Sequence, residues 1–124
     1  MSSDAPWHAH VYFAQEERAT AAALRESFRA DPAISFIGRL HDSPIGPHPI
    51  PQFELHLVEA DRAAVATRIS ASGLRALVHP LTDDDLADHT TLAQWIGEPL
   101  DLDLSVLDPP GKNQGVARFG VSDF

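Results

Sequence analysis

The sequence predicts a single α+β domain, a ferredoxin-like β-α-β-β-α-β sandwich with an added C-terminal helix and strand. Three observations lead to this prediction. Short segments of alternating apolar and polar residues, as in strands, are interleaved with segments whose apolar residues recur every three or four positions, as in helices. Clusters of proline and glycine separate these segments. The 124 residues contain no repeat and no linker, so we expect one domain over residues 1–124.

The first half of the chain holds four expected elements, in the order strand, helix, strand, strand: residues 7–13, 16–29, 33–40 and 52–58. The helix ends before Asp31-Pro32, because proline cannot continue a helix. Residues 43–51 contain four prolines and a glycine, so we expect a loop there.

The second half holds four more expected elements, in the order helix, strand, helix, strand: residues 61–72, 74–79, 82–96 and 100–107. Gly73 suits the end of the first of these helices. Thr82, followed by three aspartates, suits the start of the second. We expect residues 1–6 and 109–124 to be irregular tails.

Composition excludes several classes of function. The chain has no cysteine, which rules out disulfides, thiolate metal sites and a cysteine nucleophile. Its net charge is −9 and Lys112 is its only lysine, so it has no basic stripe to neutralise nucleic-acid phosphates. No apolar run is long enough to cross a membrane, and the first residues do not resemble a signal peptide. We therefore expect a cytoplasmic protein that binds neither nucleic acid nor membrane.

Seven histidines are unusual in so short a chain, and their placement matters more than their number. Side chains alternate between the two faces of a strand, and the apolar set of each strand must face the helices. The polar sets then converge on the other face, which a ferredoxin-like fold leaves open: His8, His10, Tyr12, Gln52, Glu54, His56, Arg75 and His79. Several imidazoles with a carboxylate are typical ligands of a divalent transition metal, and two histidines with one carboxylate form the non-heme Fe(II) oxygenase site.

Each candidate also has a plainer interpretation. An open sheet face can simply be solvated, and Glu54 can pair with Arg75. His48 lies between prolines that hold it stiffly, yet it can be only a turn residue. His89 shares a helical stripe with apolar residues, so it can be a core histidine. We expect His41, beside an aspartate, at the surface.

Several motifs in order give the chain a resemblance to a known family. They are Trp7-His8-Ala9-His10-Val11-Tyr12-Phe13, Gly46-Pro47-His48-Pro49, Gln52-Phe53-Glu54, Leu77-Val78-His79-Pro80-Leu81-Thr82, Asp88-His89-Thr90 and Trp95-Ile96-Gly97. Each motif is weak alone, but the ordered set, from residue 7 to about residue 107, resembles the DOPA 4,5-dioxygenase family of fungi and bacteria.

The resemblance implies extradiol cleavage of a catechol, DOPA or a related compound, by dioxygen. The implied cofactor is Fe(II), with Zn or another divalent ion as a surrogate, and the implied assembly is a homodimer. The expected site residues are, for the metal, His10, His79, His8 and Glu54; for catalysis, His48, His89 and Tyr12; and for substrate binding, Arg75 and Gln52. His56 lies on the right face and is held in reserve.

Two other functions remain open. The same scaffold can carry a metal-free acid/base enzyme, or a module that only binds a small ligand. The assembly is open too. We expect the aliphatic side chains of residues 100–106 to pack in the homodimer interface and shield the open face of the sheet. Alternatively, they complete the core of the monomer.

Overall fold

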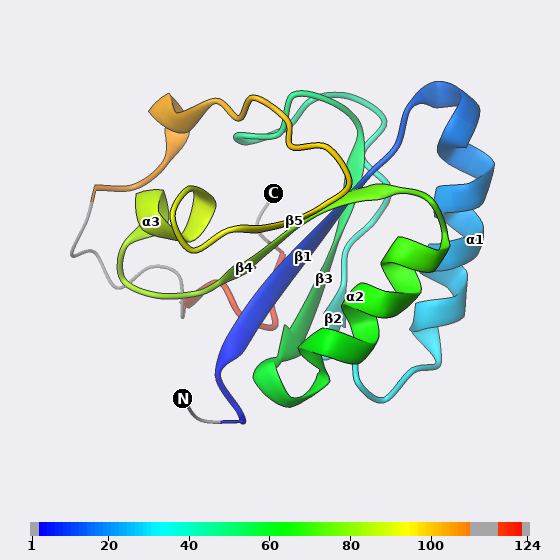
Figure 1. The fold of residues 1–124 in the computed structure, drawn as a ribbon, viewed down its shortest axis with the longest axis horizontal. Coiled ribbons are helices and arrows are strands. Elements are labelled where there is room, and N and C mark those ends of the chain that lie inside the picture. Colours follow the sequence, from blue (N-terminus) through cyan, green and yellow to red (C-terminus); the bar gives the residue numbers. More distant parts are fainter. Residues whose placement is uncertain (1–2, 110–116, 123–124) are drawn as a thin grey trace.

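A computed structural model describes residues 3–109 and 117–122 of the chain. Its centre is a five-stranded antiparallel sheet in the order β2-β3-β1-β4-β5 (Figure 1). The strands are β1 (Pro6–Tyr12), β2 (Phe36–Ile37), β3 (Gln52–Val58), β4 (Arg75–Pro80) and β5 (Gln94–Ile96). The order of the first four strands is that of the ferredoxin-like sandwich, and the predicted α+β fold class is confirmed.

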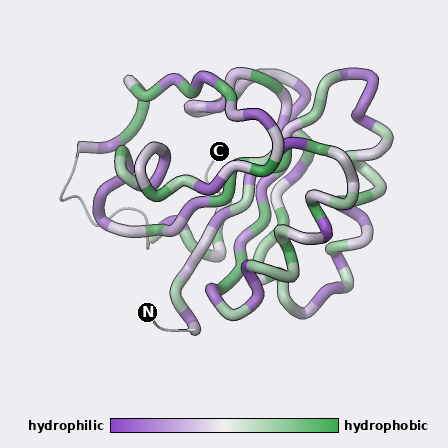
Figure 2. Tube along the Cα trace, in the orientation of Figure 1, coloured by the Kyte–Doolittle hydropathy of each residue, from purple (hydrophilic) through white to green (hydrophobic). Residues whose placement is uncertain are grey.

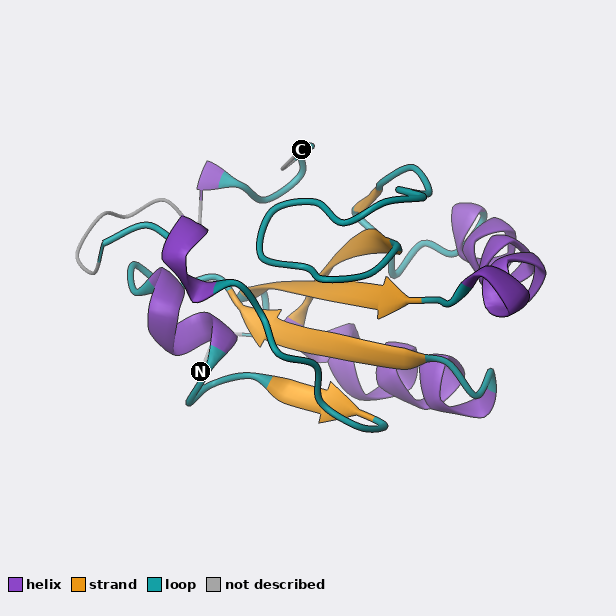
Figure 3. Ribbon diagram, turned by 90° about the horizontal axis from the view of Figure 1, so that it is seen from above, coloured by secondary structure: helices purple, strands orange, loops and turns teal. Residues whose placement is uncertain are grey.

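The two long helices, α1 (Arg18–Arg29) and α2 (Arg62–Ala71), cover one face of the sheet (Figures 1 and 3). Each is preceded by a short 3-10 turn, Gln15–Glu17 and Glu59–Asp61. Hydrophilic and hydrophobic residues alternate along the strands (Figure 2). The apolar set of each central strand packs against the helices in one core, which includes Ala9, Val11, Leu55, Val78, Phe28 and Ile69.

The other face of the sheet is covered as well, contrary to the prediction of an open face. The loop before β3, the short helix α3 (Asp85–His89), the segment with the 3-10 turn Leu104–Val106, and the C-terminal residues 117–122 lie over it (Figure 3). Its polar side chains are consequently buried, with His8 0% and His10 1% exposed. A solvated sheet face therefore does not explain the histidines.

Three predicted elements were wrong. The strand expected over residues 33–40 is only Phe36–Ile37. The helix expected over residues 82–96 ends at His89, and residues 94–96 pair instead with the edge of β4. The strand expected over residues 100–107 is absent, because Asp103 caps a 3-10 turn there by accepting the backbone N–H of Ser105.

The aliphatic residues of that last segment do not complete the monomer core. Leu104 and Val106 are 42% and 53% exposed. Among the described residues, no helix is both long and apolar enough to span a lipid bilayer.

Candidate metal centre

The register of three strands gathers the predicted polar side chains. β1 lies between β3 and β4, and its His8 stands opposite His56 on one side and His79 on the other. Two residues further along β1, His10 stands opposite Glu54. Because residues two positions apart share a face of the sheet, the imidazoles and the carboxylate converge on the covered face.

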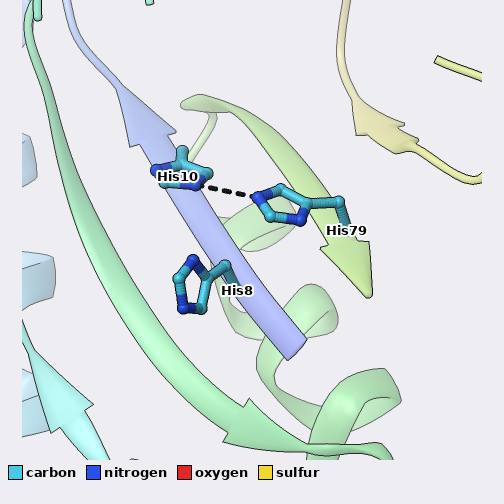
Figure 4. Close-up of side chains that lie close together, drawn as sticks. All are labelled: His8, His10 and His79. Carbon is cyan, nitrogen blue, oxygen red and sulfur yellow. Dashed lines mark hydrogen bonds between the residues drawn. The ribbon is translucent and has the colours of Figure 1, made fainter. Parts of the chain in front are cut away.

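Three of these histidines form one candidate group of metal ligands. His8, His10 and His79 each offer one ring nitrogen, and these three atoms lie within 4.8 Å of one another. Figure 4 shows the three imidazoles turned toward one another from β1 and β4. The shortest approach is 3.1 Å, between Nε2 of His10 and Nε2 of His79.

The hydrogen bonds of the other ring nitrogen, Nδ1, show where His10 and His79 carry their ring protons. Nδ1 of His79 lies 2.8 Å from the carbonyl oxygen of Pro80, and Nδ1 of His10 lies 3.1 Å from Oε1 of Gln52. Both oxygens can only accept, so each Nδ1 carries the ring proton and each Nε2 presents a lone pair. Two such lone pairs facing each other at 3.1 Å repel, so the hydrogen bond drawn between them in Figure 4 requires one ring to change its tautomer, whereas a cation between them requires no such change.

The geometry fits such a cation. Imidazole nitrogens bind divalent zinc at about 2.1 Å. Two such nitrogens 3.1 Å apart subtend roughly a right angle at the ion. Second hydrogen bonds from Nδ1 to oxygen, as in His10 and His79, are the usual support of metal-binding histidines.

Burial keeps the three imidazoles neutral, as ligands must be. It penalises the imidazolium form and lowers the pKa of His8, His10 and His79 well below its ordinary value. The repulsion that would arise if neighbouring histidines were protonated together lowers these pKa values further. Lone pairs are therefore available to a metal at neutral pH.

A second group, His8 with Glu54 and His56, is less suited to hold a metal through all three members. Nδ1 of His56 accepts the backbone N–H of Gly120 at 2.9 Å. The ring proton of His56 must then be on Nε2, which lies 3.5 Å from Oε2 of Glu54. The N–H of His56 thus lies on the side of the carboxylate, and Nε2 has no lone pair to offer a metal. Oε2 of Glu54 also lies 4.0 Å from Nδ1 of His8, and its role as a ligand stays a prediction.

Tyr12 and His48 form a buried pair beside the group of His8, His10 and His79. The hydroxyl of Tyr12 lies 2.7 Å from Nδ1 of His48, and the ring of His48 is 4.1 Å from that of His10. Burial raises the pKa of Tyr12, and it lowers the pKa of His48 to about 3. Both side chains are therefore neutral at physiological pH.

A pocket of about 180 Å³ adjoins this group, and both predicted acid/base histidines line it. The ring of His89 is 4.3 Å from that of His79, and its Nδ1 donates to the carbonyl oxygen of Asp85 at 2.8 Å. The pocket is lined by Gly46, Pro47, His48, Asp85, His89, Val106, Leu107 and Arg118. His89 is thus a buried histidine of the site, not only a core residue.

The structure differs from the sequence prediction at other positions. His41 is 5% exposed and pairs by backbone hydrogen bonds with Gln52, so its predicted surface position was wrong. Arg75 lies at the start of β4, opposite Tyr12, and does not line the pocket beside the metal group. Arg118 does line it, although no pattern in the sequence pointed to this residue of a tail expected to be irregular.

The fold and the site together define a small α+β protein with a buried cluster of three histidines that could hold a metal ion, beside a pocket. Comparison with known proteins agrees with this class. The profile of the Dopa 4,5-dioxygenase family matches residues 7–106. The chain therefore belongs to the DOPA 4,5-dioxygenase family, and this membership supports an oxygenase.

Two relatives and one solved structure illustrate the match. The DOPA 4,5-dioxygenase of Amanita muscaria is 34% identical over 111 residues, which cover 82% of this chain and 49% of the relative. An uncharacterized 21.2 kDa protein of Botryotinia fuckeliana is 36% identical over 112 residues, which cover 79% and 61%. The chain thus spans about half and about three fifths of these relatives. A crystal structure at 1.46 Å from Nostoc punctiforme, provisionally described as a dioxygenase, superimposes with a TM-score of 0.76 at 35% identity, covering 84% of this chain and 91% of that one.

Proposed function

We propose that this protein is an extradiol dioxygenase that opens the ring of a catechol, DOPA or a related compound, with dioxygen at a non-heme Fe(II). Family membership supports the reaction class. The observation that carries the proposal is the pair of lone pairs, Nε2 of His10 and Nε2 of His79, facing each other at 3.1 Å. His8 would be the third ligand, with Glu54 beside it.

A divalent ion held there would supply a Lewis acid that binds and orients both the catechol oxygens and dioxygen. The chain supplies the proton carriers. Nδ1 of His89 donates to a carbonyl oxygen, so Nε2 of His89 is left with a lone pair and can act as a general base. With Nδ1 of His48 accepting a hydrogen bond from the hydroxyl of Tyr12, the ring proton of His48 is on Nε2, and His48 can donate it as a general acid while Nδ1 takes up the hydroxyl proton.

This division of roles suits ring opening, which needs one group to take a proton from the catechol and another to return one. Both histidines line the same pocket, and their rings contact those of two proposed ligands. The covering segments would keep bulk water from the reacting atoms. The cytoplasmic location of this chemistry belongs to the same proposal.

Oxygen uptake tests the function directly. Protein purified without oxygen, loaded with Fe(II) and mixed with a panel of catechols should consume dioxygen and form a yellow ring-opened product. Zinc-loaded protein is the control, since zinc has no redox chemistry. If the iron-loaded protein consumes no dioxygen with any catechol, the dioxygenase proposal fails in favour of a metal-free enzyme or a binding module.

We also propose that the protein forms a homodimer. Leu104 and Val106 are exposed on one segment, and Leu86 of α3 is 43% exposed. Pairing such side chains between two copies would remove apolar surface from water. Sedimentation should give a dimer at micromolar concentration, and Val106→Glu should shift it toward monomer. A wild-type monomer at that concentration would contradict the proposal.

A further inference from the structure

The C-terminal residues 118–120, here called the strap, lie over the histidines although they are far away in sequence. Nε2 of His8 lies 3.3 Å from the carbonyl oxygen of Arg118, 110 residues further along the chain. The backbone N–H of Gly120 donates to Nδ1 of His56 at 2.9 Å. The ring of Phe119 stacks 5.9 Å from that of His56. The strap therefore contacts two neighbouring imidazoles through backbone groups of opposite polarity.

The first contact fixes the proton of His8. A carbonyl oxygen only accepts, so Nε2 of His8 must carry the ring proton, and the lone pair is on Nδ1. Nδ1 is buried and has no hydrogen-bond partner among the described residues. An unsatisfied buried nitrogen destabilises the folded protein. A metal ion bound with His10 and His79 would satisfy it.

The second contact fixes the proton of His56 in the opposite way. Its Nδ1 accepts from the strap, so its ring proton is on Nε2, which lies 3.5 Å from Oε2 of Glu54. His8 and His56 are stacked at 3.8 Å and nearly parallel, and without the strap either could take either tautomer. The strap thus leaves His8 with a lone pair on Nδ1 that a metal could bind, whereas the lone pair of His56 accepts a hydrogen bond from the strap itself.

The side chain of Arg118 fastens the strap. Its guanidinium pairs with Asp108 and, at 3.3 Å, with Oδ2 of Asp85. Asp85 also accepts the backbone N–H of Asp108 at 2.9 Å. Asp85 begins α3, which carries His89, so the fastening joins the strap to the wall of the pocket.

We propose that the strap is a positioning element of the metal centre, and that Arg118 is the positioning residue that holds it in place. The inference rests on the proposed metal ligands but not on the reaction. Hydrogen-bond partners of metal-binding histidines typically contribute 10- to 100-fold to metal affinity. The strap supplies that partner for His8, as Pro80 does for His79 and Gln52 for His10.

The test compares Arg118→Met with Arg18→Met, which removes an exposed ion pair to Asp42 elsewhere in the molecule. The readouts are Zn(II) affinity by competition with a chelator, and the imidazole tautomers of the metal-free protein by nitrogen-15 NMR. Arg118→Met should lower the affinity about 10- to 100-fold and turn His8 into a mixture of tautomers. Asp108→Asn should have a smaller effect in the same direction.

Two comparisons show whether the effect of Arg118→Met is confined to His8. Arg18→Met should match the wild type in both readouts, and the tautomer of His79, set by Pro80, should be unchanged in every variant. Arg118→Met with wild-type affinity and a single His8 tautomer would overturn the inference. So would a proton on Nδ1 of His8 in the metal-free wild type, a result that requires no variant to fold. A wild type that binds zinc but, with iron, opens no catechol would refute the proposed function and leave this inference standing.

Discussion

At the scale of single residues, the position of one ring proton separates histidines that are otherwise alike. His10 and His79 donate from Nδ1 to oxygen and keep Nε2 for a metal. His89 also donates from Nδ1, but its Nε2 is proposed to act as a general base toward a substrate in the pocket. His56 has the reverse arrangement, because its Nδ1 accepts from the backbone. Burial near a metal site is thus not enough to make a histidine a ligand.

The first prediction concerns a ligand. His10→Ala should lower the affinity for a divalent ion by more than about 100-fold, since losing a ligand costs more than losing its hydrogen-bond partner. Metal stoichiometry after dialysis, measured by elemental analysis, checks this. The control is His41→Ala, which removes another buried histidine that belongs to neither group of candidate metal ligands. Equal metal content in the two variants would remove His10 from the site.

The second prediction concerns the proton carriers. His48→Ala and His89→Ala should keep the metal but lower the ring-opening rate about 100-fold or more, as expected when a general acid or base is removed. Tyr12→Phe should also keep the metal and lose rate, because it removes the hydroxyl that donates to His48. Metal content and kcat are measured on the same samples. A variant that loses metal identifies its histidine as a ligand instead.

At the scale of elements, the predictable part of the fold is the part in which sequence pattern and burial coincide. β1, β3 and β4 are central strands with one apolar face, so alternation in the sequence predicted them and the face that carries the histidines. β5 was missed because its three residues are held by pairing with the edge of β4, for example Trp95 with Leu77. Such pairing is a tertiary effect that a helical stripe in the sequence conceals.

The candidate site also has a part that the sequence could predict and a part that it could not. Its strand residues could be predicted, since alternation alone assigns them to one face. Arg118 and the strap could not, because their contacts join the tail to β1 across 110 residues and leave no periodic signal. Glycine and single charged residues in a tail are equally common without any such contact. The cover over the histidines was therefore invisible to sequence analysis.

The third prediction tests the core that holds the strands in register. Leu55 lies in β3 and is 0% exposed, so Leu55→Ala should lower the free energy of unfolding by about 2–5 kcal/mol. Leu104→Ala, at an exposed position, should change it by less than about 0.5 kcal/mol. Urea denaturation followed by circular dichroism measures both. Similar losses in the two variants would mean that Leu55 does not pack in the core as described.

At the scale of the whole molecule, the buried face that gathers the candidate metal ligands also makes the stability of the fold depend on pH. His8, His10, His48 and His79 of this face are buried with lowered pKa values. In the unfolded chain the same side chains have a pKa of about 6.5. The folded protein therefore holds these imidazoles neutral. Below that pH the unfolded chain binds protons more readily than the folded protein, so each such proton favours unfolding.

The fourth prediction follows from that linkage. The pKa values of these histidines are lower in the folded protein than in the unfolded chain. The free energy of unfolding is therefore not reduced by their titration above about pH 6.5, and it falls as pH falls from there toward the pKa values of the folded protein. Each histidine can contribute up to about 1.4 kcal/mol per pH unit in that window. Urea midpoints of the metal-free protein at pH 8, 7, 6 and 5 should fall most steeply below pH 6.5, and His48→Gln should flatten the slope. Carboxylates titrate mainly below this range, so an unchanged midpoint between pH 7 and pH 5 would show that the histidines are not held neutral by burial.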